Sequence, residues 1–381
     1  MEAGAEPTAM VGARGAEGPR RTREGLPFWG LWAFLALEAA LFVVTGLVID
    51  IGTGFVAAAG GLFVSGAISM LSLSLTDSPS GIAVRRLLRK KIAVGALVFV
   101  SVFYLSGVLA PVLPIPAYTK QDLTQAEKGP SAAHPFGTDR LGRDQLSRVI
   151  WSSQTTAIVT VATLFTGGLV LSVSLGLISG YIGGWVDTAI MRVGDIFASL
   201  PGILMLILIN ATLKPQVRSL AADLEDLTGI ADIVKSGAPD YFLIFGALSL
   251  FGWVGGARII RSQILALRET EFITAARSLG ASTPHILFRH MLPNVSNIII
   301  VSLSLGLAGI AGSEIVLTWF GIGIQPPHPS FGSLIFDASS VRTVNTHPYL
   351  LAFPGAIVAG LLFSFNLLGD ALTDVFTPKA R

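Results

Sequence analysis

In this chain of 381 residues, 52% are hydrophobic and only 13% are charged, and long apolar runs recur along the whole length, which excludes a single soluble domain. The net charge of +2 is too small to indicate a nucleic-acid partner, and the absence of cysteine excludes disulfides, thiolate metal sites and cysteine nucleophiles. The composition therefore predicts an all-α polytopic membrane protein.

The amino-terminal part of the chain is expected to form a tail and a hairpin. Residues 1–26 are polar and rich in Gly, Ala and Arg, which predicts a disordered tail that stays in the cytoplasm. Apolar runs near 28–49 and 53–75 are each long enough for a span, so 27–84 is expected to be an accessory transmembrane hairpin. The link between the runs carries Asp50 but no Lys or Arg, and we expect it to face outward.

A dense cationic cluster precedes the third apolar run. Its five members, all within seven residues, are Arg85, Arg86, Arg89, Lys90 and Lys91. Because cytoplasmic loops carry an excess of Lys and Arg, the cluster predicts that the third span, near 92–114, runs outward. We interpret the cluster as a topological anchor rather than as a lipid or nucleic-acid site.

Later apolar runs bring the expected number of spans to about eight, with both termini in the cytoplasm. The five further runs lie near 155–180, 194–213, 241–261, 295–320 and 348–369. The run 194–213 is the weakest prediction, because Asp195 and Pro201 stand near its start. The alternation of sides places residues 262–293 in the cytoplasm and residues 115–153 outside.

The predicted outer segment 115–153 contains HPFGTDRLGRDQLSRVIWSSQ, in which acidic and cationic side chains alternate. The run from Gly137 to Asp139 predicts a turn that leads into a helix cap. Arginines outside oppose the positive-inside rule, and we expect local aspartates to offset their charge. A functional segment and an interface helix held by ion pairs would both give this pattern.

A second outer segment, 214–240, forms an acidic insertion. Leu220, Leu224 and Leu227 recur in it at helical spacing, which predicts a helix with one apolar face. Such a helix either lies on the membrane surface or meets an external binding protein, and we favour the surface position.

The stretch 271–294, EFITAARSLGASTPHILFRHMLPN, is a polar, helix-forming segment between two apolar runs. Phe272, Ala276, Leu279 and Ile286 recur at roughly helical spacing, which predicts that this face is buried and the opposite face is wet. A connector on the bilayer surface and a docking element for a partner both fit this composition.

One charged side chain lies deep inside an apolar run. Burying a charge in a span costs about 3 kcal/mol on insertion scales, so Glu314 requires a reason. Gly306, Gly309 and Gly312 precede it at three-residue spacing, which would let another helix approach closely. Glu314 is expected either to meet a substrate ammonium in a pathway, or to bond a hydroxyl of a neighbouring helix or lie in water at the outer boundary.

The polar segment resembles the EAA-x3-G-x9-I-x-LP loop of the transmembrane subunits of bacterial ABC importers, which couples them to ATPase subunits. The residues on the motif positions are Thr274, Ala275, Ala276, Gly280, His290, Leu292 and Pro293. Thr274 replaces the glutamate of the motif, although Glu271 lies one turn earlier, and His290 replaces its isoleucine. With Ala281, these residues form the coupling site that the resemblance implies.

The outer segment HPFGTDRLGRDQLSR resembles the signature of the C-type permease subunit of dipeptide and oligopeptide importers. Its motif residues here are Gly137, Thr138, Asp139, Gly142, Arg143 and Asp144. SGYIGGWVDTAIMRVGDIFASLPGILM, EIVLTWFGIGIQPPHPSFGSLI and FNLLGDALTDVFTP follow in the same order as in that subunit, so the resemblance covers about 85–381. It implies a six-helix type I importer core, to which this chain adds the hairpin.

The resemblance also implies function and partners. It implies a permease that forms half of a translocation pathway in the bacterial cytoplasmic membrane, with a second permease, two ATPase subunits that bind ATP and Mg, and an extracytoplasmic solute-binding protein. The chain has no GxxxxGK[ST] loop and no HExxH, and its five histidines are scattered, which predicts no ATPase activity, no metal site and no cofactor of its own. A di- or oligopeptide is the expected solute; nickel or another small solute, and an ATP-independent carrier or channel, are the alternatives.

Overall fold

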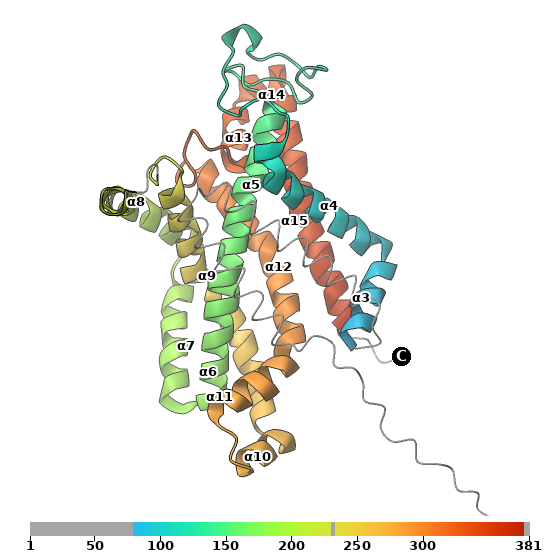
Figure 1. Ribbon diagram of the computed structural model, residues 1–381, viewed down its shortest axis with the longest axis vertical. Coiled ribbons are helices and arrows are strands. Elements are labelled where there is room, and N and C mark those ends of the chain that lie inside the picture. Colours follow the sequence, from blue (N-terminus) through green and yellow to red (C-terminus); the bar gives the residue numbers. More distant parts are fainter. Residues whose placement is uncertain (1–78, 230–232, 377–381) are drawn as a thin grey trace, which may run out of the picture.

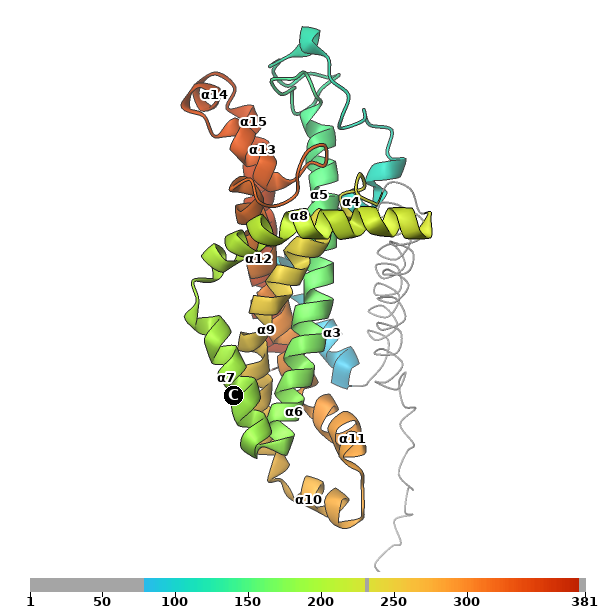
Figure 2. The same cartoon turned by 90° about the vertical axis from the view of Figure 1, so that its left-hand side faces the viewer.

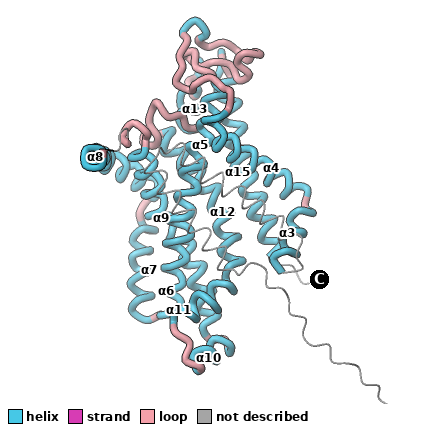
Figure 3. Tube along the Cα trace, viewed as in Figure 1, coloured by secondary structure: helices cyan, strands magenta, loops and turns pink. Residues whose placement is uncertain are grey.

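The computed structural model describes residues 79–229 and 233–376, and this part of the chain consists of helices, loops and one isolated bridge (Figure 3). Six helical segments in it are long and apolar enough to cross a membrane: Lys91–Val112, Gln145–Ile182, Gly202–Thr228, Ala238–Arg268, Thr283–Trp319 and Tyr349–Val375. The predicted all-α class and six-helix core are therefore confirmed. The tail 1–26 and the runs 28–49 and 53–75 lie outside the described residues.

The long helices run side by side along the long axis of the molecule (Figure 1). They are α4 (Lys91–Leu109), α5 (Gln145–Thr163), α6 (Ser174–Ile182), α7 (Gly184–Ser199), α9 (Ala238–Arg268), α12 (Leu292–Trp319) and α15 (Tyr349–Phe376). At one end, which we call the α10 end, lie α10 (Glu271–Ser278) and α11 (Thr283–His285). At the other, which we call the α14 end, lie α13 (Phe331–Ala338), α14 (Val341–Thr346) and residues 113–144.

Small residues let α6 lie close to α9. A Cβ atom added to Gly176 would lie 2.8 Å from the carbonyl oxygen of Ala257, and one added to Gly180 would lie 2.8 Å from Cβ of Ile264. Gly176 and Gly180, which are spaced as in a GxxxG motif, therefore form the face of α6 that packs against α9. Leu164–Val173 joins α5 to α6 as a π-helical stretch, so that residues 145–182 form one continuous helical segment that begins ten residues before the predicted span.

The predicted span 194–213 is wrong in its boundaries, because its residues are divided between two helices. α7 ends at Ser199, and α8 (Gly202–Thr228) begins after Leu200 and Pro201, both of which have extended backbone. A residue before proline avoids the helical region, which explains the break. Asp195 lies inside α7, where it pairs with Arg258 of α9 at 2.7 Å.

The second half of α8 lies across the long axis of the bundle (Figure 2). The helix predicted in the insertion 214–240 is present, but it is the continuation of α8, which already begins at Gly202, and α9 begins at Ala238, before the insertion was expected to end. Aromatic side chains of α4, α13 and α15 form the core near the α14 end, among them Phe103, Phe331 and Phe365.

The helix that precedes the first described span packs against the last one. α3 (Pro79–Arg89) contributes Leu87 to a cluster with Val375 of α15, and the ammonium of Lys90 lies 2.7 Å from the carboxylate of Asp374. The two ends of the described chain therefore contact one another.

Candidate functional site

The short helix α10 forms the tip of the α10 end (Figures 1 and 2). It ends in a Schellman-type turn, in which the amide of Gly280 donates to the carbonyl of Arg277 at 3.0 Å and the amide of Ala281 donates to the carbonyl of Ala276 at 3.1 Å. The φ of Gly280 is 81°, a left-handed backbone that glycine adopts without strain. The glycine of the motif therefore determines where α10 ends.

The buried residue of α10 is Ile273, whose side chain is fully buried against the bundle. Phe272 is 45% exposed and Leu279 is 89% exposed. The predicted buried face is therefore wrong for Phe272 and Leu279, because the helix turns the residue after Phe272 inward, while Ala276 is half-buried. Ile286, beyond the glycine, is buried as predicted. Phe272 and Leu279 are therefore left on the outer surface of α10 and the turn that ends it.

Ile273 connects α10 to several spans. It belongs to one apolar cluster with residues of α6, α9, α12 and the π-helical turn Ile286–Met291, namely Leu177, Ile260, Ile264, Ile286, Met291, Leu292, Val295 and Ile299 among others. The guanidinium of Arg277 lies 5.6 Å from the centre of the Tyr181 ring, which adds a cation–π contact to α6. A displacement of α10 must therefore act on α6, α9 and α12 together.

The structure places the nine residues of the coupling motif in two groups. Glu271, Thr274, Ala275, Ala276, Gly280 and Ala281 lie on α10 or in the turn that ends it. His290 lies in the π-helical turn Ile286–Met291, and Leu292 and Pro293 begin α12. Thr274, in the glutamate position, donates its hydroxyl to the carbonyl of Thr270 at 3.2 Å, and Leu292 is buried.

A second candidate site at the α14 end centres on the carboxylate of Asp139. Its Oδ1 accepts from the amides of Leu141 and Arg143, both at 2.9 Å. Its Oδ2 accepts from Nε of Arg143 and Nη1 of Arg148, both at 2.7 Å. Four donors thus satisfy this buried carboxylate, and two cations offset its charge. The expected pairing of arginines with local aspartates is present.

The helix cap lies later than the sequence predicted. Asp144, not Asp139, caps α5: its Oδ2 accepts from the amide of Ser147 at 2.7 Å. Its Oδ1 lies 2.8 Å from Nδ1 of His134. Thr138 pairs with Asp144 in the isolated bridge, so the chain makes a further turn between the two before the helix begins.

That further turn depends on Gly142. Its φ is 69°, and an added Cβ would lie 1.7 Å from the carbonyl oxygen of Asp122, so no other residue fits. The carboxylate of Asp122 accepts a hydrogen bond from the hydroxyl of Thr124 at 2.5 Å and another from the amide of Thr124 at 3.0 Å. These hydrogen bonds hold the pKa of Asp122 below its usual range. Gly137 lies against the carbonyl of Lys128 and the ring of Tyr349 in the same way. The motif glycines therefore close this segment onto itself and onto α15.

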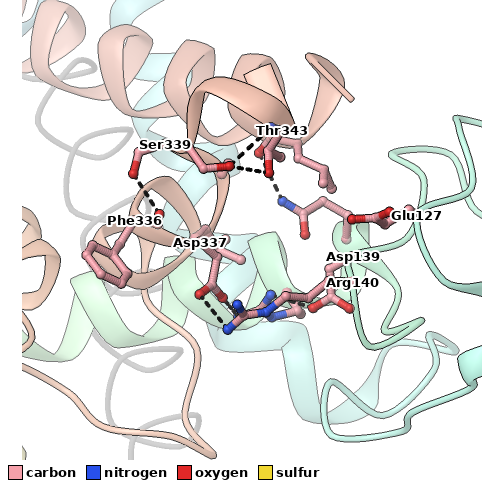
Figure 4. Close-up of a pocket in the computed structure, with 13 residues that line it drawn as sticks. Glu127, Asp139, Arg140, Phe336, Asp337, Ser339 and Thr343 are labelled. Atoms are coloured by element: carbon pink, nitrogen blue, oxygen red, sulfur yellow. Dashed lines mark hydrogen bonds and ion pairs between the residues drawn. The ribbon is translucent and has the colours of Figure 1, made fainter. Parts of the chain in front are cut away.

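A cavity of about 310 Å³ separates this segment from α13 and α14. Asp139 and Arg140 line one side, and Asp337 of α13 lines the other (Figure 4). Asp337 lies 3.4 Å from Nη2 of Arg148 and 3.5 Å from Nη2 of Arg140. Asp337 was not predicted from the sequence, although three arginines beside two aspartates in one segment were a signal that a further carboxylate was needed. These ion pairs therefore connect α5 and the segment before it to α13.

Glu314 bridges two helices inside the bundle. It is fully buried; its Oε2 accepts from the Thr156 hydroxyl of α5 at 2.9 Å, and its Oε1 accepts from the Thr318 hydroxyl at 3.2 Å. This geometry fits helix packing rather than a pathway. Within the described residues, nothing lies within 4 Å of a Cβ placed on Gly306 or Gly309, so the close helix approach expected there is absent.

The sequence matches two family models. Residues 172–381 match the model described as binding-protein-dependent transport system inner membrane component. Residues 78–130 match the model of the N-terminal transmembrane domain of oligopeptide transport permease C. The first match contains α10 and the whole coupling motif, and the second begins just before α3.

Named relatives align with most of the chain. The dipeptide transport system permease protein DppC of Alkalihalophilus pseudofirmus is 34% identical over 304 residues, which cover 80% of this chain and 91% of the relative. The oligopeptide transport system permease protein OppC of Bacillus subtilis is 32% identical over 314 residues, covering 82% and 93%. The glutathione transport system permease protein GsiD of Pectobacterium atrosepticum is 33% identical over 300 residues, covering 78% and 90%.

Proposed function

The chain belongs to the family of inner membrane components of binding-protein-dependent transport systems, and from this premise we propose that it is a permease subunit of an ABC importer for di- or oligopeptides. It forms half of the translocation pathway, beside a second, similar permease. The relatives support the solute class, since they are named for dipeptide, oligopeptide and glutathione transport.

One observation supports this proposal above the others: α10 presents Phe272 and Leu279 on its surface while Ile273 ties it to three spans. An exposed apolar surface at the tip of a short helix suits a groove on a partner protein. In the proposed complex that partner is one of two ATPase subunits, which bind ATP and Mg. The coupling residues are those from Glu271 to Ala281, together with His290, Leu292 and Pro293.

The proposed mechanism is alternating access. ATP binding closes the pair of ATPase subunits, and the movement reaches the bundle through α10 and the apolar cluster around Ile273. The pathway between the two permeases then opens outward and takes the solute from an external solute-binding protein. Hydrolysis of ATP then returns the pathway to its starting state.

In this mechanism the α10 end and both termini lie in the cytoplasm, and the α14 end lies outside.

The proposal is tested by purifying the tagged chain in mild detergent together with its bound proteins. We expect an ATPase pair and a second permease to co-purify, and ATP hydrolysis to rise when the binding protein and a peptide are added together. A chain that purifies alone, and moves solute in vesicles without ATP, would overturn the proposal in favour of a carrier or channel.

The same assay separates the solute classes. Dipeptides, longer peptides, glutathione and nickel are added in parallel with the binding protein. Stimulation of ATP hydrolysis by peptides but not by nickel supports a peptide as the solute. Stimulation by nickel alone would still support an ABC importer, but with nickel as its solute.

A further inference from the structure

The second half of α8 is a helical arm that the proposed transport cycle does not use. We call residues 214–228 the arm. It lies across the axis of the bundle in Figure 2, and Figure 1 shows it end-on at the edge of the molecule. Gly229, with φ of 69°, ends it.

Ion pairs with the start of α9 fix the direction of the arm. The buried carboxylate of Asp240 lies 3.1 Å from the ammonium of Lys214 and 3.2 Å from Nη2 of Arg218. Further along, Oε1 of Glu225 accepts from the amide of Val234 at 2.8 Å. The arm is therefore held at both ends, and its position is not that of a frayed helix end.

One face of the arm is apolar and open. At 100° per residue, Leu220, Leu224 and Leu227 fall within an arc of about 60°, and Leu213 in the preceding turn falls in the same arc. The side chains of these leucines are between 43% and 82% exposed. Ala221, which is buried, faces the bundle on a different side. The apolar face therefore does not belong to the core.

Neighbouring residues indicate the depth at which the arm lies. Residues 210–218 of α8 share a cavity with the loop 321–326, which directly follows Trp319 and Phe320 at the end of α12. Both aromatic side chains are exposed, 37% and 52%, and aromatic residues concentrate where spans meet the lipid headgroups. The arm thus leaves the bundle at the depth where α12 ends.

We propose that the arm is an interfacial helix that binds the lipid surface at the α14 end. Its leucines enter the boundary between headgroups and acyl chains, and Asp223 and Asp226 on the flank of the helix face water. A helix that leaves the bundle sideways at this depth meets lipid first. The proposal depends on the proposed function only for naming this surface the outer leaflet.

Because the chain contains no cysteine, the position of the arm is measured with single-cysteine variants. A nitroxide is attached to Leu224→Cys or Leu227→Cys on the apolar face, and to Ala222→Cys or Asp226→Cys on the other faces. The full chain, with the subunits that co-purify with it, is placed in bilayers of phosphatidylethanolamine and phosphatidylglycerol. Collisions with oxygen, which concentrates in lipid, and with a water-soluble nickel chelate are then compared.

We expect the ratio of oxygen to nickel collisions to be at least about threefold higher at Leu224 and Leu227 than at Ala222 and Asp226. Leu204→Cys, an exposed position in the first turn of α8, is the lipid reference, and Lys120→Cys in the exposed loop is the water reference. Equal ratios on all faces, close to the water reference, would overturn the proposal.

A protein partner gives a different result. If the leucine positions are shielded from both oxygen and nickel, a second permease covers the face; if they become shielded only when the binding protein is added, that protein does. Either outcome replaces lipid as the partner. None of these results depends on transport, so they are independent of the test of the proposed function.

Discussion

At the scale of single residues, two buried carboxylates are stabilised in different ways. Asp139 has two guanidinium groups and two amides, so its charge is offset within the segment that carries it. Glu314 has only the hydroxyls of Thr156 and Thr318 as hydrogen-bond donors. A carboxylate in such a place contributes through hydrogen bonds between helices and not through an ion pair.

We therefore expect Glu314→Leu to lower the free energy of unfolding by about 2 kcal/mol, because it leaves the buried hydroxyls of Thr156 and Thr318 without their acceptor. Glu314→Gln removes the charge and retains an oxygen that accepts from Thr156, while its amide NH2 can donate to the hydroxyl of Thr318, so the variant should remain within about 1 kcal/mol of the unmodified protein. Thermal unfolding in detergent measures both. If the glutamine variant is as unstable as the leucine variant, the charge itself is required and the packing role is wrong.

Gly142 gives a second prediction at this scale. Gly142→Ala places a Cβ atom on the carbonyl of Asp122 in a left-handed turn, and we expect it to cost at least about 3 kcal/mol. Gly129→Ala is the matched control, since nothing lies within 4 Å of its Cβ position. The thermal midpoints of the two variants are compared; equal midpoints would show that the segment can relax around residue 142.

Local signals were enough to predict the motif glycines but not their partners. Gly280 and Gly142 were identified by the resemblance to the family motifs, and each lies in a tight turn, which is a local property of the chain. Asp337 lies on a helix almost two hundred residues from the arginines it meets, so no local pattern identifies it. Ile273 was missed for another reason: the side of α10 that faces the bundle depends on how the loop docks, and the neighbouring Phe272 fits the same apolar spacing.

At the scale of elements, apolar runs predicted the spans but not their ends. The helix of residues 145–182 begins where Asp144 supplies a cap, in a polar stretch that hydropathy does not mark as a span. Residues 194–213 read as one span because their apolar content is continuous, whereas Pro201 divides them between α7 and α8. The positions of helix caps and prolines therefore determine where the helices begin and end more closely than hydropathy does.

The element-scale prediction for α10 concerns its exposed apolar side chains. Leu279→Asp should sharply reduce the amount of ATPase that co-purifies with the chain, without changing its thermal unfolding, because the side chain is 89% exposed. Val341→Asp on α14, where valine is 78% exposed, is the matched control at the opposite end and should retain the ATPase. Equal recovery from both variants would count against α10 as the docking element.

The arm of α8 provides the second element-scale prediction. Asp240→Asn removes the charge that Lys214 and Arg218 share, so the arm should become mobile while the bundle stays folded. A nitroxide at Leu224 should then give a narrower spectrum than it gives with Asp240 present. An unchanged spectrum would mean that the ion pairs of Asp240 are not required, and that the bond between Glu225 and Val234 or the contact with lipid holds the arm.

At the scale of the whole molecule, the described helices place α10 and α14 at opposite ends (Figure 1). The predicted topology assigns the α10 end to the cytoplasm from the cationic cluster near residues 85–91. A membrane-impermeant maleimide tests this on intact cells. Val341→Cys should react directly, and Ser282→Cys beside α10 should react only after permeabilisation; the reverse pattern would invert the topology.

The fold class and the order of the motifs were predictable because membrane spans and turn-forming glycines are encoded locally. The arrangement of the candidate sites was not, since both are made by contacts between distant helices. The apolar cluster that connects α10 to the bundle contains residues from 173 to 299. The ion-pair network around Asp139 includes Asp337, which pairs with Arg148.

α9 connects the two ends of this molecule without interruption. Its 31 residues form a rod about 46 Å long, which begins beside the arm and ends three residues before α10. If such a rod pivots near one end, a tilt of only about 5° carries the other end through about 4 Å. In the proposed importer, such leverage would let a small shift at the α10 end reposition the far end of α9, while every hydrogen bond along the rod stays intact.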